Sequence, residues 1–151
     1  VPLVIDADGI NALCGSIDII KKRNAPVILT PHPGEMARLC SLTVKQIESN
    51  RAEAARNFAV KYGCILVLKG ANTIIAEPSG ELYFNMTGNP GMSTGGSGDA
   101  LSGIIVSLLA QGFSAAEAAK AGVYLHGEAG DSAAAKRGER AMLPSDLIEE
   151  L

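Results

Sequence analysis

Residues 26–69 begin with the apolar run Pro26-Val27-Ile28-Leu29-Thr30 and end with a second one, Cys64-Ile65-Leu66-Val67-Leu68-Lys69. Short runs of branched aliphatic residues predict buried strands. Between them, Thr43-Val44-Lys45-Gln46 has the capping-box pattern that starts a helix. The apolar spacing carries this helix to about Tyr62, where a glycine follows as a stop signal. A strand, a helix and a strand in this order form a parallel crossover unit.

Two further strand signals flank this unit. Residues 1–8 predict a buried strand whose C-terminal end delivers carboxylates. On the other side, residues 73–76 and 81–84 surround the turn Pro78-Ser79-Gly80 and predict an antiparallel hairpin. The sequence therefore predicts a parallel sheet with an appended hairpin.

The remainder of the chain predicts helices. Apolar residues at helical spacing end at Gly112, and Ser114-Ala115-Ala116-Glu117 is a second capping box that opens an alanine-rich helix toward Ala135. Within that helix His126 has apolar neighbours, and we expect it to be a structural or capping histidine. A last helix is expected over residues 147–151. Alternating strands and helices predict an α/β fold with a mainly parallel sheet.

Composition excludes several classes of protein. The chain has 151 residues, a length typical of one domain, with 13 Lys and Arg against 16 Asp and Glu. This balance gives no basic surface for nucleic acid or membrane lipid. The longest apolar run, residues 103–110, is far below the ~20 residues of a membrane span, so we expect a cytoplasmic protein. The cysteines form no CxxC pair and are expected to be buried small hydrophobes: Cys14, Cys40 and Cys64.

The strongest chemical signal is Asn89-Pro90-Gly91-Met92-Ser93-Thr94-Gly95-Gly96-Ser97-Gly98-Asp99. Clustered glycines before a helix allow backbone N–H groups to approach a phosphate or a developing anion, which the helix dipole also favours. Asp99 would repel a phosphate unless it has another task, such as accepting a proton from a substrate hydroxyl. The alternative is that the glycines only turn the chain and Asp99 caps the helix.

Further polar residues follow the predicted strands, at the edge where open α/β sheets bind ligands. In Thr30-Pro31-His32-Pro33-Gly34-Glu35, one turn could aim His32 at a ligand and Glu35 at a metal or its water, although a rigid turn with a solvated glutamate explains the pattern equally well. Lys69 could meet phosphate, or it could simply be solvated. A last group, Asp6, Asp8 and Asn11, leaves the first strand toward the same edge.

Four motifs together resemble one known family. They are residues 4–8 with Asn11, residues 29–35, residues 67–73, and residues 89–92 with 95–99. This set resembles the NAD(P)H-hydrate dehydratase family of the ribokinase-like superfamily over essentially all of residues 1–151. The resemblance implies a ribokinase-like three-layer αβα fold. Because domains of the family begin well before the strand at residue 1, it also implies that residues 1–151 are the C-terminal portion of such a domain.

The family repairs NADH or NADPH whose nicotinamide ring has gained water. The resemblance implies ADP-dependent dehydration of the S form of the hydrated cofactor, giving AMP and phosphate, with ATP as the donor in eukaryotic members. Asp99 would take the proton of the ring hydroxyl as it attacks the terminal phosphoryl group. The resemblance further implies an oligomer, since tetramers are common in the family, and no nucleic-acid or membrane partner.

The resemblance also implies a role for each site residue. His32 and Asp99 would contact the hydrated cofactor, and Glu35 resembles a magnesium-linked glutamate. The anion hole would comprise Gly95, Gly96, Ser97 and Gly98. The nucleotide would be bound by Lys69, Gly70, Ala71, Asn72, Thr73 and Gly98. Two alternatives stay open, a small-molecule kinase acting on a carbohydrate or hydroxymethyl group and a catalytically silent nucleotide-binding module. His32 stands where superfamily kinases have asparagine, which disfavours an ordinary sugar kinase.

Overall fold

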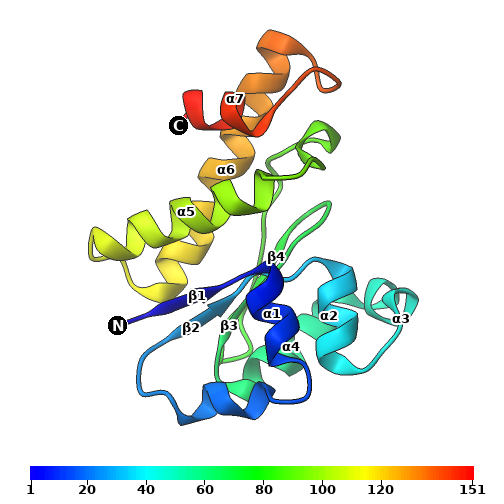
Figure 1. Ribbon diagram of the computed structural model, residues 1–151, viewed down its shortest axis with the longest axis vertical. Coiled ribbons are helices and arrows are strands. Elements are labelled where there is room, and N and C mark those ends of the chain that lie inside the picture. The colour runs from blue at the N-terminus through cyan, green and yellow to red at the C-terminus, as the bar shows by residue number, and fades with distance from the viewer. The chain divides into compact units, whose positions relative to one another are not determined.

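The computed structural model describes residues 1–151, which form two compact units, Val1–Phe84 and Asn85–Leu151. Figure 1 shows strands only in the first unit and helices as the main elements of the second. None of the helices is long and apolar enough to cross a membrane.

The first unit is built on a sheet in which neighbouring strands follow sequence order. The strands are β1 (Leu3–Ile5), β2 (Val27–Leu29), β3 (Ile65–Leu68), β4 (Ile74–Ala76) and β5 (Leu82–Phe84). The first three are parallel, and the last two form the antiparallel hairpin that the sequence predicts. The hairpin thus contributes half of the strand pairings, which makes the sheet mixed.

The predicted burial is correct for two of the three parallel strands. Every residue of β2 and β3 is buried. In β1 Leu3 is 38% exposed and the other two residues are only partly buried, so the prediction of a buried first strand is wrong. The reason is positional, because β1 pairs with β2 alone and lies at an edge of this sheet.

Helices pack on this sheet and complete one hydrophobic core. They are α1 (Ala7–Leu13), the 3-10 helix η1 (Ile17–Lys22), α2 (Pro33–Cys40), α3 (Val44–Ser49) and α4 (Arg51–Tyr62). Helix α4 packs against β3 and β4. The largest fully buried side chains of this unit include Ile10, Leu29, Met36, Ile47, Leu66 and Leu68. This core fixes the ends of the parallel strands.

The predicted helix from residue 44 to residue 62 is two helices. Its capping box and its stop at Gly63 are confirmed, but Asn50 ends α3 and also caps α4, and its side chain accepts a hydrogen bond from Glu53 N. Asparagine amides compete with helical hydrogen bonds in this way. The break brings Arg51 to the first position of α4.

The second unit contains the 3-10 helix η2 (Pro90–Met92), α5 (Ser97–Ala110), α6 (Ala115–Arg137) and α7 (Pro144–Glu149). The capping box of Ser114 and Glu117 opens α6 as predicted. Helix α7 begins at Pro144 rather than at residue 147, because proline is favoured in the first turn of a helix. Its start is secured by Asp146 Oδ2, which accepts from Leu143 N at 2.8 Å.

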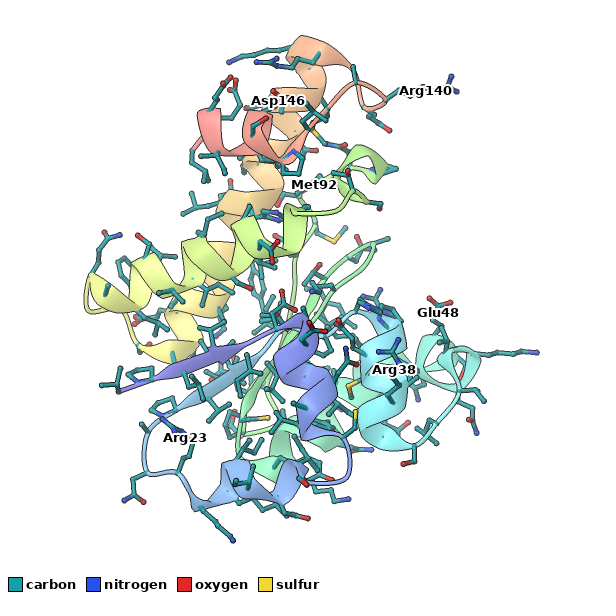
Figure 2. All side chains as sticks on the ribbon, in the orientation of Figure 1. Arg23, Arg38, Glu48, Met92, Arg140 and Asp146 are labelled. Carbon is teal, nitrogen blue, oxygen red and sulfur yellow. The ribbon has the colours of Figure 1, made fainter.

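Glycines let other segments lie close to α6. A Cβ atom at Gly122 would lie 2.7 Å from Ile105 Cγ1 of α5. At Gly127 it would lie 2.0 Å from Thr87 Oγ1, and at Gly130 2.3 Å from the Sδ atom of Met92, which Figure 2 labels in η2. The segment that leads into the glycine-rich loop is therefore seated directly on the α6 backbone.

The cysteines do not all behave as predicted. Cys64 is buried, and burial raises the pKa of its thiol to about 12, as expected for an inert small hydrophobe. Cys40 is partly buried. Cys14 is exposed, against the prediction, because it stands at the C-terminal cap of α1, beyond the part of the helix that reaches the core.

Candidate functional site

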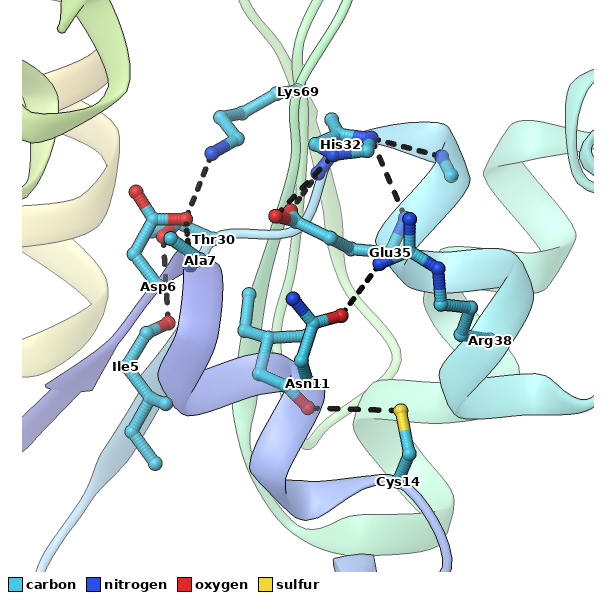
Figure 3. A network of polar contacts seen from close by, with 12 residues as sticks. Ile5, Asp6, Ala7, Asn11, Cys14, Thr30, His32, Glu35, Arg38 and Lys69 are labelled. Atoms are coloured by element: carbon cyan, nitrogen blue, oxygen red, sulfur yellow. Dashed lines mark hydrogen bonds and ion pairs between the residues drawn. The ribbon is translucent and has the colours of Figure 1, made fainter.

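Three strand ends of the first unit meet in one polar network (Figure 3). Asp6 follows β1, Thr30 follows β2 and Lys69 follows β3. Lys69 Nζ lies 2.8 Å from Asp6 Oδ1, and Lys69 N donates to Pro31 O at 2.8 Å. The ends of β1 and β2 are joined by Thr30, whose backbone N–H donates to Ile5 O at 3.2 Å. The predicted convergence of these strand ends is confirmed within this unit.

The Asp6 carboxylate is held in its charged form. Burial alone would raise its pKa, but the hydrogen bond and the charge of Lys69, with the Ala7 N–H and the Thr30 side chain, hold the pKa below the ordinary aspartate value. Asp6 also caps α1 by accepting from Ala7 N at 2.9 Å. Ala7 has φ +47°, a strained conformation for a residue with a Cβ atom. The carboxylate therefore fixes a bend and neutralises Lys69.

His32 and Glu35 cap α2 reciprocally. His32 Nδ1 accepts from Gly34 N at 3.0 Å and from Glu35 N at 3.4 Å, while a Glu35 carboxylate oxygen accepts from His32 N at 2.9 Å. Because Nδ1 is an acceptor, the ring proton lies on Nε2, which is 3.3 Å from Glu35 Oε1. The His32 side chain is 50% exposed but that of Glu35 only 7%, so His32 is the member that a ligand can touch.

The residues present do not form a metal centre by themselves. No group of three or more His, Cys, Asp or Glu side chains is arranged to hold a metal ion, and both carboxylate oxygens of Glu35 face His32. Magnesium in nucleotide sites takes one or two carboxylates and relies on substrate phosphates for the remaining protein-side ligands. Glu35 in this arrangement orients His32, and a metal role for it stays a prediction.

Of the other residues expected at this edge, one contacts the neighbouring helix and one is exposed. Asn11 Oδ1 accepts from Arg38 Nη1 at 2.5 Å, which ties α1 to α2. Asp8 is exposed in the first turn of α1. Arg38 was not predicted, and its position one turn beyond Glu35 on α2 is the only signal that could have suggested it.

The loop after β3 carries the residues expected to bind nucleotide. It turns through Gly70 at φ +141° and Asn72 at φ +54°, and Thr73 Oγ1 donates to Gly70 O at 3.1 Å. Arg51 was not predicted, and its guanidinium donates to the backbone oxygens of Leu68, Lys69 and Ala71. Because Arg51 lies on α4, well before this loop in the sequence, the residues of the loop itself give no sign of the contact.

In the second unit the start of α5 is open. The residue before the helix is Gly96, at φ +95°, and no side chain makes a capping hydrogen bond there. Asp99 lies exposed in the first turn and does not cap the helix, so the capping alternative is wrong. Backbone N–H groups in a first turn have no partner within the helix, and of these only that of Ser97 donates into the loop, to Thr94 O at 3.3 Å. The loop thus offers donors, the positive end of the helix dipole and one free carboxylate.

His126 anchors this loop, as its predicted structural role implies. Its Nε2 atom lies 2.9 Å from Ser97 O and 3.2 Å from Ser97 Oγ. Ser97 is buried, in contrast to the exposed glycines before it. A residue that was not predicted, Asp131, accepts from Gly88 N at 2.8 Å and from the Asn89 side chain at 2.9 Å. Helix α6 therefore holds the loop at both ends.

Comparison with solved structures gives the class of protein. A structure of an ADP/ATP-dependent NAD(P)H-hydrate dehydratase from Bacillus subtilis, co-crystallised with ATP and Mg²⁺, matches 99% of this chain and 52% of its own, with a TM-score of 0.88 and 36% identity. A ribokinase-like superfamily protein from Enterococcus faecalis matches 97% of this chain and 49% of its own, with a TM-score of 0.76 and 34% identity. The α/β fold is therefore ribokinase-like, as expected.

A family model described as NAD(P)H-hydrate dehydratase matches residues 1–151. The chain belongs to this family. It is 51% identical over 151 residues to the bifunctional NAD(P)H-hydrate repair enzyme Nnr of Moorella thermoacetica, of which it spans 28%. It is 47% identical over 132 residues to the ADP-dependent (S)-NAD(P)H-hydrate dehydratase of Neisseria meningitidis, covering 86% of this chain and 45% of that protein. The chain thus spans less than half the length of these curated relatives.

Proposed function

We propose that the protein containing this chain dehydrates the S form of hydrated NADH or NADPH, with ADP as the phosphoryl donor and AMP and phosphate as products. The observation that carries the proposal is the open start of α5, where uncapped N–H groups stand beside an exposed carboxylate in the first turn. Membership of the dehydratase family supports the substrate class. The name of the Neisseria relative supports ADP, and the Bacillus structure with ATP makes ATP the donor to compare.

Each chemical group of the reaction has a proposed partner in the chain. Asp99 removes the proton from the ring hydroxyl, whose oxygen attacks the terminal phosphorus of ADP while the bond to the AMP oxygen breaks. The N–H groups around Gly95, Gly96, Ser97 and Gly98 stabilise the charge that develops on the phosphoryl oxygens. Gly98 and the loop of residues 69–73 bind the nucleotide.

The second step needs no further donor. Phosphate is a good leaving group, so the lone pair of the ring nitrogen expels it as the carbon–oxygen bond breaks. Loss of a proton from the neighbouring ring carbon restores the dihydropyridine. His32, half of whose side chain is exposed, contacts the hydrated cofactor, while Glu35 holds it in place through its ring Nε2 and its backbone N–H.

Magnesium, when bound, would neutralise nucleotide phosphate charge. The only buried carboxylate proposed to hold it is engaged with His32. Omission of magnesium is therefore expected to weaken nucleotide use without changing how His32 and Asp99 act.

The test uses the full-length protein with hydrated NADH and either ADP or ATP, with magnesium present. Recovery of the near-ultraviolet absorbance of NADH supports the proposal, and no recovery with either nucleotide overturns it. A stable phosphorylated product without free phosphate would instead identify a small-molecule kinase.

A further inference from the structure

Arg51 makes an unusual set of contacts for an arginine at the start of a helix. Its Nη1 atom donates to Ala71 O at 2.5 Å, and its Nη2 atom donates to Leu68 O at 3.2 Å and to Lys69 O at 3.3 Å. The Nε atom is buried with no partner, and burial lowers the pKa of the guanidinium although Glu48 opposes the shift. Taking part of a cation out of water to bind only backbone oxygens is costly, so the loop geometry that Arg51 maintains needs an explanation.

These contacts fix the direction of the peptide groups. In a trans peptide the C=O and N–H bonds point in opposite directions, and the chain has no cis peptide bond. The Leu68–Lys69 peptide shows the pattern, since its oxygen faces Arg51 while Lys69 N donates to Pro31 O on the opposite side. The Lys69–Gly70 and Ala71–Asn72 peptides also have their oxygens on Arg51. Their N–H groups, which belong to Gly70 and Asn72, therefore point away from the guanidinium. Neither N–H donates to another group of the chain.

The loop needs support from outside its own residues. Gly70 at φ +141° and Asn72 at φ +54° both occupy conformations that residues with side chains rarely adopt. A Cβ atom at Gly70 would lie 2.9 Å from Arg51 Nη2, so the arginine and the bare backbone fit closely. The contacts of Arg51 therefore secure a loop conformation that offers two unpaired N–H donors.

We propose that Arg51 is a positioning residue for the adenine nucleotide: it holds residues 69–72 so that Gly70 N and Asn72 N donate to acceptor atoms of the nucleotide. This inference rests on the proposed function, which assigns this loop to the nucleotide. The cation also polarises the peptides whose oxygens it binds, which strengthens the N–H groups on their far side as donors. Arg51 itself does not touch the nucleotide.

The test compares Arg51→Lys with Arg56→Lys in the full-length protein. Lysine keeps the charge but cannot bind several carbonyl oxygens as a planar fork. We expect Arg51→Lys to raise the nucleotide KM about tenfold or more, with kcat at saturating nucleotide and the KM of the hydrated cofactor within about threefold. Arg56 lies on the same helix and donates to Gly80 O at 3.0 Å in the hairpin turn. Its replacement should leave the nucleotide KM unchanged.

A merely structural arginine would behave differently. It would lower stability and the amount of active enzyme, and therefore apparent kcat, while the nucleotide KM stayed that of the parent; this result overturns the proposal. If Arg51→Lys folds poorly, Gly70→Ala, which crowds the guanidinium from the loop side, must raise the nucleotide KM in the same way. Equilibrium binding of ADP separates this inference from the proposed function. If the parent protein binds ADP but does not dehydrate the cofactor, the Arg51→Lys variant must still bind ADP more weakly than the parent does. If the parent protein binds no ADP, both this inference and the proposed function are refuted.

Discussion

The starts of α2 and α5 differ in how their first backbone N–H groups are treated. Both helices begin with N–H groups that lack helical partners. At α2 the chain satisfies them with its own side chains, through the reciprocal contacts of His32 and Glu35. At α5 it places a left-handed glycine, Gly96, and no capping side chain. The first helix start is thus closed by side chains that orient one histidine, whereas the second has no side-chain cap, and it is there that we propose an anion binds.

The largest expected effect comes from the carboxylate at the open end. Asp99→Asn removes the proposed base but keeps the shape of the side chain, so kcat should fall by about 10²- to 10⁴-fold with thermal unfolding unchanged. Steady-state kinetics with hydrated NADH measure the loss. Glu117→Gln is the matched control, since Glu117 is a first-turn carboxylate of α6 whose capping role glutamine can keep. Equal loss in both variants would refute a specific role for Asp99.

The next effect tests the open backbone itself. Gly96→Ala places a Cβ atom at φ +95° and 3.2 Å from Pro144 Cγ, so it should cost about 1–2 kcal/mol of unfolding free energy and lower kcat. Gly95→Ala has open space around the new atom and no positive φ, and its unfolding free energy should change by less than ~0.5 kcal/mol. Denaturant titration of both variants checks this. If both lose the same free energy, the left-handed turn is not what shapes the loop.

A smaller effect separates capping from ligand binding at the closed end. His32→Asn keeps a capping side chain, so stability should hold while the KM of the hydrated cofactor rises about tenfold. His32→Ala should show the same change in KM and also lose about 1 kcal/mol of unfolding free energy. Kinetics and chemical denaturation of the two variants are compared. An unchanged KM in His32→Asn would limit His32 to its structural role.

The smallest effect is the acid dependence of stability at the strand ends. Asp6 has a folded-state pKa below its ordinary value of 3.8. The stability that it contributes is therefore complete above that value and is lost as pH falls through the lower folded pKa. Unfolding measured between about pH 5 and pH 2 should show this loss in the parent and a smaller one in Asp6→Asn. Identical pH profiles would mean that Lys69 does not hold the charge on Asp6.

Local signals made much of this fold predictable. Capping boxes at Thr43 and Ser114 and the stop at Gly63 are short-range patterns, and the structure bears out all three. The break at Asn50 was missed because helical spacing of apolar residues continues across it, while a single amide decides the local hydrogen bonds. The ends of helices thus depend on hydrogen bonds of individual side chains, which the spacing of apolar residues does not reveal.

The candidate site was predictable as a set of motifs but not as a set of contacts. The glycine-rich loop, His32 and Lys69 were found from spacing and resemblance. The ion pair of Lys69 with Asp6, the contacts of Arg51 and the anchoring by Asp131 join residues far apart in sequence, so they arise only from the folded arrangement. These long-range partners decide which predicted side chains are free to meet a ligand.

The most direct test of the open start of α5 measures two products of one reaction. The full-length protein is mixed with hydrated NADH and ADP in the presence of magnesium, and NADH absorbance and AMP are followed together. One NADH is expected for each AMP in the parent protein, and both should form about 10²- to 10⁴-fold more slowly in Asp99→Asn. AMP formed without NADH, or turnover in Asp99→Asn at the rate of the parent, would contradict the role of this helix start.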